Sequence, residues 1–332
     1  MRYIMPIVEQ LDRAARELAT DHPINNRLAL ILIDNATELV LHWRCTMHAR
    51  YAKEYLELGE EKLSPSQRQM ALGPYLDGKL RVLHDLEEIT EDERRFVTIS
   101  HDYRSELYHI GLKHDNVIRA IAGRYYELAC DLFLRLPPDY TRWSSTDQVT
   151  EVGQRYLDKV NGGKMFPLEV DKLAPALLAE KPEVEELQLA LAQAADDSID
   201  DLEEAFEFIV NDNPARIEAA ELLQQIQFHN DFLVRAEKER IEGSKWDPVY
   251  QKRMRDLRNE MRKSWRSRYK RIPLDNWRCR AKAIAVEPTG LRTLSSYQAL
   301  RNDMNYLETA IGDAAAELDA WIQLEIDRAR GK

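Results

Sequence analysis

Glycine and cysteine are both scarce in this chain, and no long hydrophobic run occurs. Only 12 of the 332 residues are glycine, and most segments are rich in alanine, leucine, glutamate, arginine and glutamine, which favour helices. The three cysteines, Cys45, Cys130 and Cys279, are far apart and odd in number, which argues against a disulfide framework or a zinc knuckle. We therefore expect an all-α protein in a reducing, cytoplasmic setting.

Several classes of function lack their sequence signals here. The longest purely aliphatic run, residues 28–33 (LALILI), is too short to span a bilayer, and the first residues lack the apolar run of a signal peptide. A phosphate-cradling GxxxxGK[ST] loop, a dinucleotide-binding GxGxxG turn and a zinc-binding HExxH helix are also missing. We expect no membrane association, no metal and no cofactor.

A long helix is predicted after a break at residues 21–26 (DHPINN). Its apolar positions at near-helical spacing are Leu28, Ile31, Leu32, Leu39 and Trp43. We expect this helix to lie at the centre of the core.

The next well-defined helix spans residues 90–111. Thr90 and Glu93 have the spacing of a capping box, and Gly111 stands where a left-handed C-terminal cap would end the helix. Its apolar stripe comprises Phe96, Ile99, Tyr103, Leu107 and Ile110. Another amphipathic helix follows, with the apolar positions Val117, Ile121, Tyr125, Leu128, Leu132 and Leu136.

The pattern predicts two helical domains: residues 1–140 and residues 183–332, joined by an irregular linker over 141–182. The second domain ends in a long helix with alternating steps of three and four. Its apolar positions are Tyr297, Leu300, Met304, Leu307, Ile311, Ala314, Leu318 and Trp321. We expect long antiparallel, coiled-coil-like helices in this domain.

One short stretch suggests chemistry. Residues 103–116 (YRSELYHIGLKHDN) place Arg104 five residues before His109. Metal-independent RNA cleavage needs a base for the 2′-hydroxyl proton and a cation for the charged phosphorus centre, and this pair can supply both. Residues five apart lie about 140° apart around a helix, so one helix does not bring the pair together unless its end kinks. A two-fold dimer could instead assemble a shared site from both copies. The competing interpretation is a solvated helix flank.

The context of this pair resembles the HEPN superfamily of small helical bundles. The similarity covers residues 25–136, from the helix LALILIDNATELVLHW through YRSELYHIG to DNVIRAIAGRYYELACDLFLRL. It implies a homodimeric, metal-independent endoribonuclease, with a toxin or anti-phage role, in which Arg104 and His109 are catalytic. Ser105 occupies a position that is often Asn or Asp in the family. Gly111 occupies the position at which some members carry a Tyr that a partner enzyme modifies with a nucleotide.

Four further residues are candidates for supporting roles. Asp34 and Glu38, one helical turn apart, could bind a metal or orient Arg104. His101 and Tyr108 share with Ser105 the face opposite the apolar stripe, which is either plain surface or a dimer contact. His101 also follows Arg94 and Arg95 at spacings similar to that of the first pair.

Charge is segregated in the second half. Residues 180–210 carry eleven acids and one lysine, whereas 252–282 carry thirteen lysines and arginines against three acids. The two tracts could neutralise each other. Alternatively the basic one binds RNA phosphates. The RNA-binding candidates are Arg255, Arg258, Arg262, Arg266 and Lys270. In that case Trp265 or Tyr269 is available for base stacking, although both align with Met254, Leu257 and Met261, which favours core positions.

The leading hypothesis is an endoribonuclease acting on an RNA substrate through 2′-hydroxyl attack at a dimeric Arg/His site. The alternatives are a catalytically silent HEPN-like dimeric scaffold or regulatory module that binds a protein partner through the C-terminal helices, and a helical adaptor unrelated to that superfamily.

Overall fold

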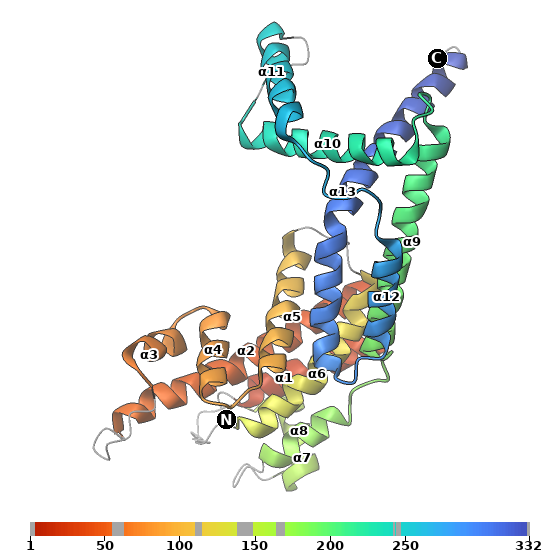
Figure 1. Cartoon of the computed structure of the whole chain (residues 1–332). Helices are drawn as coiled ribbons and strands as arrows, with labels where there is room; N and C mark the ends of the chain where they lie inside the picture. Colours follow the sequence, from red (N-terminus) through yellow and green to blue (C-terminus); the bar gives the residue numbers. More distant parts are fainter. Residues whose placement is uncertain are drawn as a thin grey trace. The chain divides into compact units, whose positions relative to one another are not determined.

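The computed structural model describes residues 4–54, 63–109, 115–137, 149–163, 170–241, 243 and 247–330. These residues form thirteen α-helices and no strand, so the all-α prediction is confirmed (Figure 1). The helices are α1 (Ile4–Thr20), α2 (Pro23–Glu54), α3 (Pro65–Leu72), α4 (Leu76–Asp85), α5 (Glu91–His109), α6 (Asp115–Arg135), α7 (Glu151–Asn161), α8 (Val170–Leu178), α9 (Leu187–Asp212), α10 (Ala219–Lys238), α11 (Pro248–Ser264), α12 (Leu274–Ala285) and α13 (Gly290–Ala329). Among the helices described, none combines the length and apolar character needed to cross a membrane.

The chain folds into two compact units whose boundaries differ from the predicted ones. Unit 1 comprises Met1–Leu191 and Ile284–Ser296, and unit 2 comprises Ala192–Ala283 and Tyr297–Lys332. The helix α9 begins in unit 1 and continues into unit 2, because the chain does not break between them. The sequence pattern predicted that the two domains are divided in a loop. In the structure the boundaries of the two units fall within helices α9, α12 and α13.

The prediction of an irregular linker over 141–182 is wrong for residues 151–161 and 170–178, which are helical. Helices α7 and α8 occupy much of this range, and both pack on the rest of unit 1. Tyr156 of α7 donates a hydrogen bond to buried Asp12, and Tyr126 of α6 donates one to the carbonyl of Leu177 in α8. Glycines and prolines suggested a loop, but Thr150 caps α7 and Gly162 ends it in a left-handed conformation.

The centre of unit 1 is α2 packed between α1 and α6, as expected for a core helix. Its buried face is not the predicted one, however. Leu28 and Leu39 are 37% and 36% exposed. The buried positions of this helix include Ala29, Leu30, Ile33, Asp34, Ala36, Thr37, Val40, Leu41 and Cys45. The core therefore meets a neighbouring flank of α2 that contains a carboxyl and a hydroxyl group.

Helices α5 and α6 follow the sequence signals closely. The amide of Thr90 donates to Glu93 Oε2, 2.7 Å away, and the amide of Glu93 donates to Thr90 Oγ1, 3.2 Å away, so the capping box is confirmed. Phe96 and Tyr103 are buried and Ile99 is partly buried, and all six apolar positions predicted for the next helix, from Val117 to Leu136, are buried. Ile110 and the predicted cap Gly111 lie outside the described residues.

Unit 2 contains the basic tract and most of the long last helix. From Tyr297 to Ile311 the predicted apolar positions of α13 are buried, whereas Trp321 is exposed. Helices α10 and α11 form a smaller pair with its own apolar cluster around Phe232 and Leu257. The basic helix α11 is thus anchored by one apolar side.

Candidate functional site

A buried carboxyl group organises the polar contacts between α2, α5 and α6. Asp34 of α2 is fully buried, and its Oδ2 lies 2.9 Å from Nδ1 of His101 in α5. Tyr125 of α6 donates its hydroxyl to the other oxygen, Oδ1, at 3.0 Å. Arg104, one turn after His101, brings its Nε to 3.7 Å from Asp34 Oδ2. Three helices therefore meet at one side chain.

Glu38 completes this group, which we call the Asp34 cluster: Asp34, Glu38, His101, Arg104 and Tyr125. Glu38 lies one turn after Asp34, and its Oε1 is 3.3 Å from the same Nδ1 of His101. The side chains of His101 and Arg104 are 28% and 26% exposed, and that of Glu38 is 39% exposed. The cluster therefore extends from the buried Asp34 to a mouth that solvent reaches.

A cavity opens beside this mouth. Its volume is about 620 Å³, and α2 contributes Asn35, Glu38, Leu39 and His42 to its lining. Asn35 also accepts a hydrogen bond of 3.4 Å from the guanidinium of Arg104. Two residues therefore connect the cavity to the Asp34 cluster. Glu38 belongs to both, and Asn35 lines the cavity and binds Arg104 of the cluster.

The cluster favours a protonated histidine. Hydrogen bonds to Asp34 and then to Glu38 raise the pKa of His101 to about 10. The same contact with His101 lowers the pKa of Glu38. Burial raises the pKa of Tyr125, which remains a neutral donor. At neutral pH two acidic side chains thus face an imidazolium and a guanidinium, and their charges balance.

Three residues of the cluster, Asp34, Glu38 and His101, have side chains of the types that bind metal ions. Atoms of Asp34, Glu38 and His101 that could act as ligands all lie within 4.8 Å of one another, a separation compatible with one ion. A divalent cation would have to displace the proton of His101 and would sit beside the guanidinium of Arg104, 3.7 Å from the shared carboxylate. The electrostatics of the cluster therefore suit a bound proton better than a metal.

The predicted site residues are brought together only in part. Arg104 lies beside Asp34, in the orienting position suggested for that acid, and Glu38 joins them through His101. Ser105 is partly buried on α5. Tyr108 and His109 belong to the last turn of α5, but their side chains lie outside the described residues. The geometry between Arg104 and His109 is therefore not described.

One of the two alternatives for the face that carries His101, plain surface, is contradicted, and two contributors to the cluster were not predicted. His101 does not lie on plain surface, because it turns toward α2 and contacts two carboxyl groups. Tyr125 was predicted only as a core position, since apolar spacing carries no information about its hydroxyl. Asn35, directly after Asp34, could have been identified as polar and adjacent.

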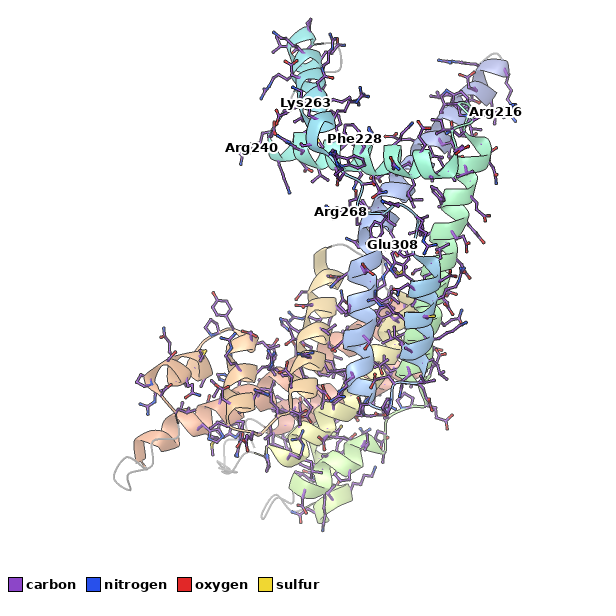
Figure 2. The ribbon with its side chains drawn as sticks, in the orientation of Figure 1. Arg216, Phe228, Arg240, Lys263, Arg268 and Glu308 are labelled. Carbon is purple, nitrogen blue, oxygen red and sulfur yellow. The ribbon has the colours of Figure 1, made fainter. Side chains whose placement is uncertain are left out.

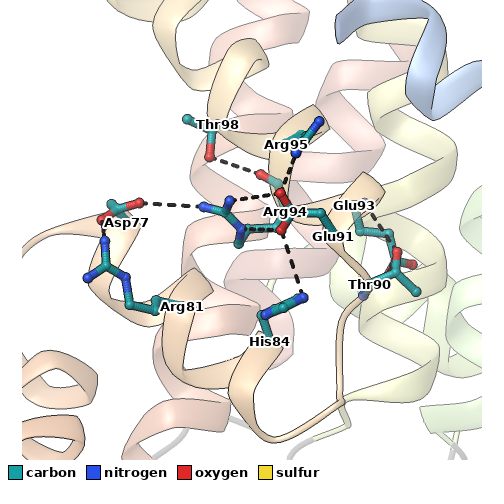
Figure 3. A network of polar contacts seen from close by, with 9 residues as sticks. All are labelled: Asp77, Arg81, His84, Thr90, Glu91, Glu93, Arg94, Arg95 and Thr98. Carbon is teal, nitrogen blue, oxygen red and sulfur yellow. Dashed lines mark hydrogen bonds and ion pairs between the residues drawn. The ribbon is translucent and has the colours of Figure 1, made fainter.

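The two arginines that precede His101 at a similar spacing belong to a different network (Figure 3). Arg94 and Arg95 both bind Glu91 in the first turn of α5, with Nε to carboxylate distances of 2.7 and 2.6 Å. His84 of α4 lies 3.8 Å from the same glutamate. These contacts tie α4 to α5, and neither arginine is paired with His101.

The RNA-binding candidates lie on exposed surface in unit 2. Arg255, Arg258 and Arg262 are exposed on α11, and Arg266 and Lys270 are exposed in the segment after it. Among the described residues of the basic tract, Arg278 of α12 pairs with the acidic tract. Its partners there are Asp200 and Glu203 of α9. Mutual neutralisation thus accounts for little of the basic tract among the residues that the structure describes.

Comparisons with known proteins add no family to this geometry. No protein-family model matches the chain, and neither the curated proteins nor the solved structures contain a match. The function must therefore be argued from the residues themselves.

Proposed function

We propose that unit 1 is a metal-independent endoribonuclease whose site lies at the mouth of the Asp34 cluster. The observation that carries this proposal is the buried carboxyl group of Asp34, which holds His101 and Arg104 at a partly exposed surface beside a cavity. A cation that is fixed in place before substrate arrives is what stabilises a developing negative charge most effectively. The HEPN resemblance that the sequence suggests for residues 25–136 would imply the same activity.

The proposed roles follow from protonation. Cleavage begins when a base removes the 2′-hydroxyl proton, the 2′ oxygen bonds to phosphorus, and the bond to the 5′ oxygen breaks as that oxygen receives a proton. His101 holds its proton at neutral pH, so it suits the acid or electrostatic role and not the base role. The base is therefore assigned to His109, and Arg104 is assigned to the phosphate. The products are a 2′,3′-cyclic phosphate and a 5′-hydroxyl.

A homodimer is part of the proposal. Positions 104 and 109 lie about 140° apart around a straight helix. A two-fold pair of α5 helices could present Arg104 of one copy and His109 of the other to one phosphate. The protein is accordingly expected to be dimeric when it is active.

The second candidate is a catalytically silent scaffold, and one observation favours it. The acidic and basic groups of the Asp34 cluster pair with each other, as they would in a polar contact that only fixes α2 against α5. Such a protein would use the exposed side of α5 for dimerisation and its C-terminal helices for a protein partner.

RNA cleavage in EDTA separates these candidates. The assay compares wild type with Arg104→Ala and His109→Ala, and Arg95→Ala serves as the matched control because Arg95 is an exposed arginine of α5 that binds Glu91. Each site variant should lose about 10²–10⁴-fold in rate, with the control unchanged and cyclic phosphate at the wild-type ends. Equal rates in all four proteins would exclude both residues from the mechanism. A wild-type dimer inactive on all RNAs would support the scaffold.

A further inference from the structure

The exposed side of α11 carries a continuous row of cations. We call it the basic stripe: Lys252, Arg255, Arg258, Arg262 and Lys263. At 100° per residue these five positions fall within about 140° of one another, and all are exposed. The apolar residues Leu257 and Met261 point to the other side, where they pack with Phe232 and Ala236 of α10. Figure 2 labels Lys263 on α11 and Phe228 on α10.

The five cations of the basic stripe outnumber the acid at its edge, the exposed Asp256, one turn after Lys252. None of its five side chains forms an ion pair with a described acid, and Arg258 instead lies over the ring of Phe232, 4.8 Å from its centre. Glu260, on the flank of α11, is engaged by Arg235 of α10 at 2.7 Å. Like charges three and four residues apart repel each other, so an external anion would relieve this repulsion.

The length of the basic stripe indicates what kind of anion it can bind. It runs for about 16 Å along the helix, and it continues past the helix end with the exposed residues Arg266, Lys270 and Arg271. A row of this length matches several successive phosphates of a polymer better than a single small anion.

The neighbouring aromatic residues are not free to stack on bases. Trp265 donates its indole N–H to Asp231 at 2.8 Å and packs edge-on against Phe228. Tyr269 lies against Trp277 and reaches Asp303 with its hydroxyl. Because single-strand recognition relies on such rings, the stripe offers cations for phosphates but no platform on which bases would stack.

A membrane surface fits less well than a polynucleotide. An interfacial helix needs an apolar face to insert below the headgroups, and Met254, Leu257 and Met261 of α11 pack against α10. We propose that the basic stripe binds the phosphate backbone of nucleic acid without sequence preference. This inference goes beyond the proposed ribonuclease, since the stripe lies in unit 2 and uses no residue of the Asp34 cluster.

Fluorescence anisotropy with the full chain tests this inference. The probes are duplex DNA, duplex RNA and two single-stranded homopolymers, with vesicles containing phosphatidylserine as a separate arm. The stripe variant carries Lys252→Glu, Arg255→Glu and Arg262→Glu. The matched control carries Arg216→Glu, Arg328→Glu and Arg330→Glu, three exposed cations elsewhere in unit 2, and changes the net charge by the same amount.

Wild type should bind both duplexes, with an affinity that falls as salt rises. The stripe variant should bind at least about 10-fold more weakly, and its plot of log K against log salt should be shallower by about 3, as expected for three lost phosphate contacts. The control should bind like wild type. Three results would each overturn the inference. They are an equal loss of affinity in the stripe variant and the control, a wild type that binds only vesicles, and a strong preference between the two homopolymers. The duplex DNA probe has no 2′-hydroxyl, so its binding is measured independently of the proposed RNA cleavage.

Discussion

Raising the pH should destabilise unit 1 through a single side chain, His101. Its pKa is about 10 in the folded protein, against about 6.5 in an unfolded chain. Below the lower value both states are protonated and the stabilisation is fully present. Between the two values the folded state keeps a proton that the unfolded state releases, so the free energy of unfolding falls as pH rises.

The magnitude follows from the proton linkage and the exposure of the site. One retained proton lowers the free energy of unfolding by about 1.4 kcal/mol per pH unit, or about 2.7 kcal/mol between about pH 7 and 9. The side chain of His101 is 28% exposed and shares its proton with two acids. Screening by solvent and coupling to these acids reduce the expected loss to about 1–1.5 kcal/mol.

Urea unfolding of wild type and His101→Gln across this pH range isolates the effect. The difference in unfolding free energy between the two proteins should shrink as pH rises, because the variant has no proton to retain at this position. The exposed His22, at the junction of α1 and α2, supplies the control His22→Gln, which should parallel wild type. Side-chain NMR of labelled histidines should also show one resonance, missing in His101→Gln, that titrates near pH 10.

Two results would refute this reasoning. One is a wild-type-to-variant difference that stays constant from pH 7 to 9, and the other is a His101 resonance with its midpoint near the ordinary value of about 6.5. Either result would mean that Asp34 and Glu38 do not hold the proton. His101 would then be free to act as a base, and the assignment of that role to His109 would lose its argument.

Two further substitutions test the fold around the site. Asp34→Asn should lower the unfolding free energy, measured by urea unfolding, by about 2–3 kcal/mol, because it leaves the cations of His101 and Arg104 without their buried partner. A change below about 0.5 kcal/mol would show that the carboxylate does not anchor them. Thr90→Ala should cost about 1 kcal/mol through loss of the capping box with Glu93, measured by thermal unfolding at fixed pH, and an unchanged midpoint would contradict the capping role.

Local signals allowed much of the fold to be predicted. The capping box at Thr90, the break before α2 and the apolar spacing of α6 each depend on residues close in sequence, and each is present in the structure. The segment 141–182 was misassigned because its glycines and prolines were weighted above its buried residues. Tyr156 and Leu177 decide that region, and their partners lie in α1 and α6, far away in sequence.

The candidate site could be predicted only in outline, and His101 shows why. A helical wheel assigns α5 one buried face through Phe96 and Tyr103, and so places His101 on the opposite, solvated side. In the structure α5 contacts α2, α4 and α6, so α2 also covers the side that carries His101. The useful signal was in α2, where Asp34 interrupts the apolar run LILIDNATEL. A buried acid requires a cationic or donor partner, and the half-covered polar side of α5 is where that partner lies.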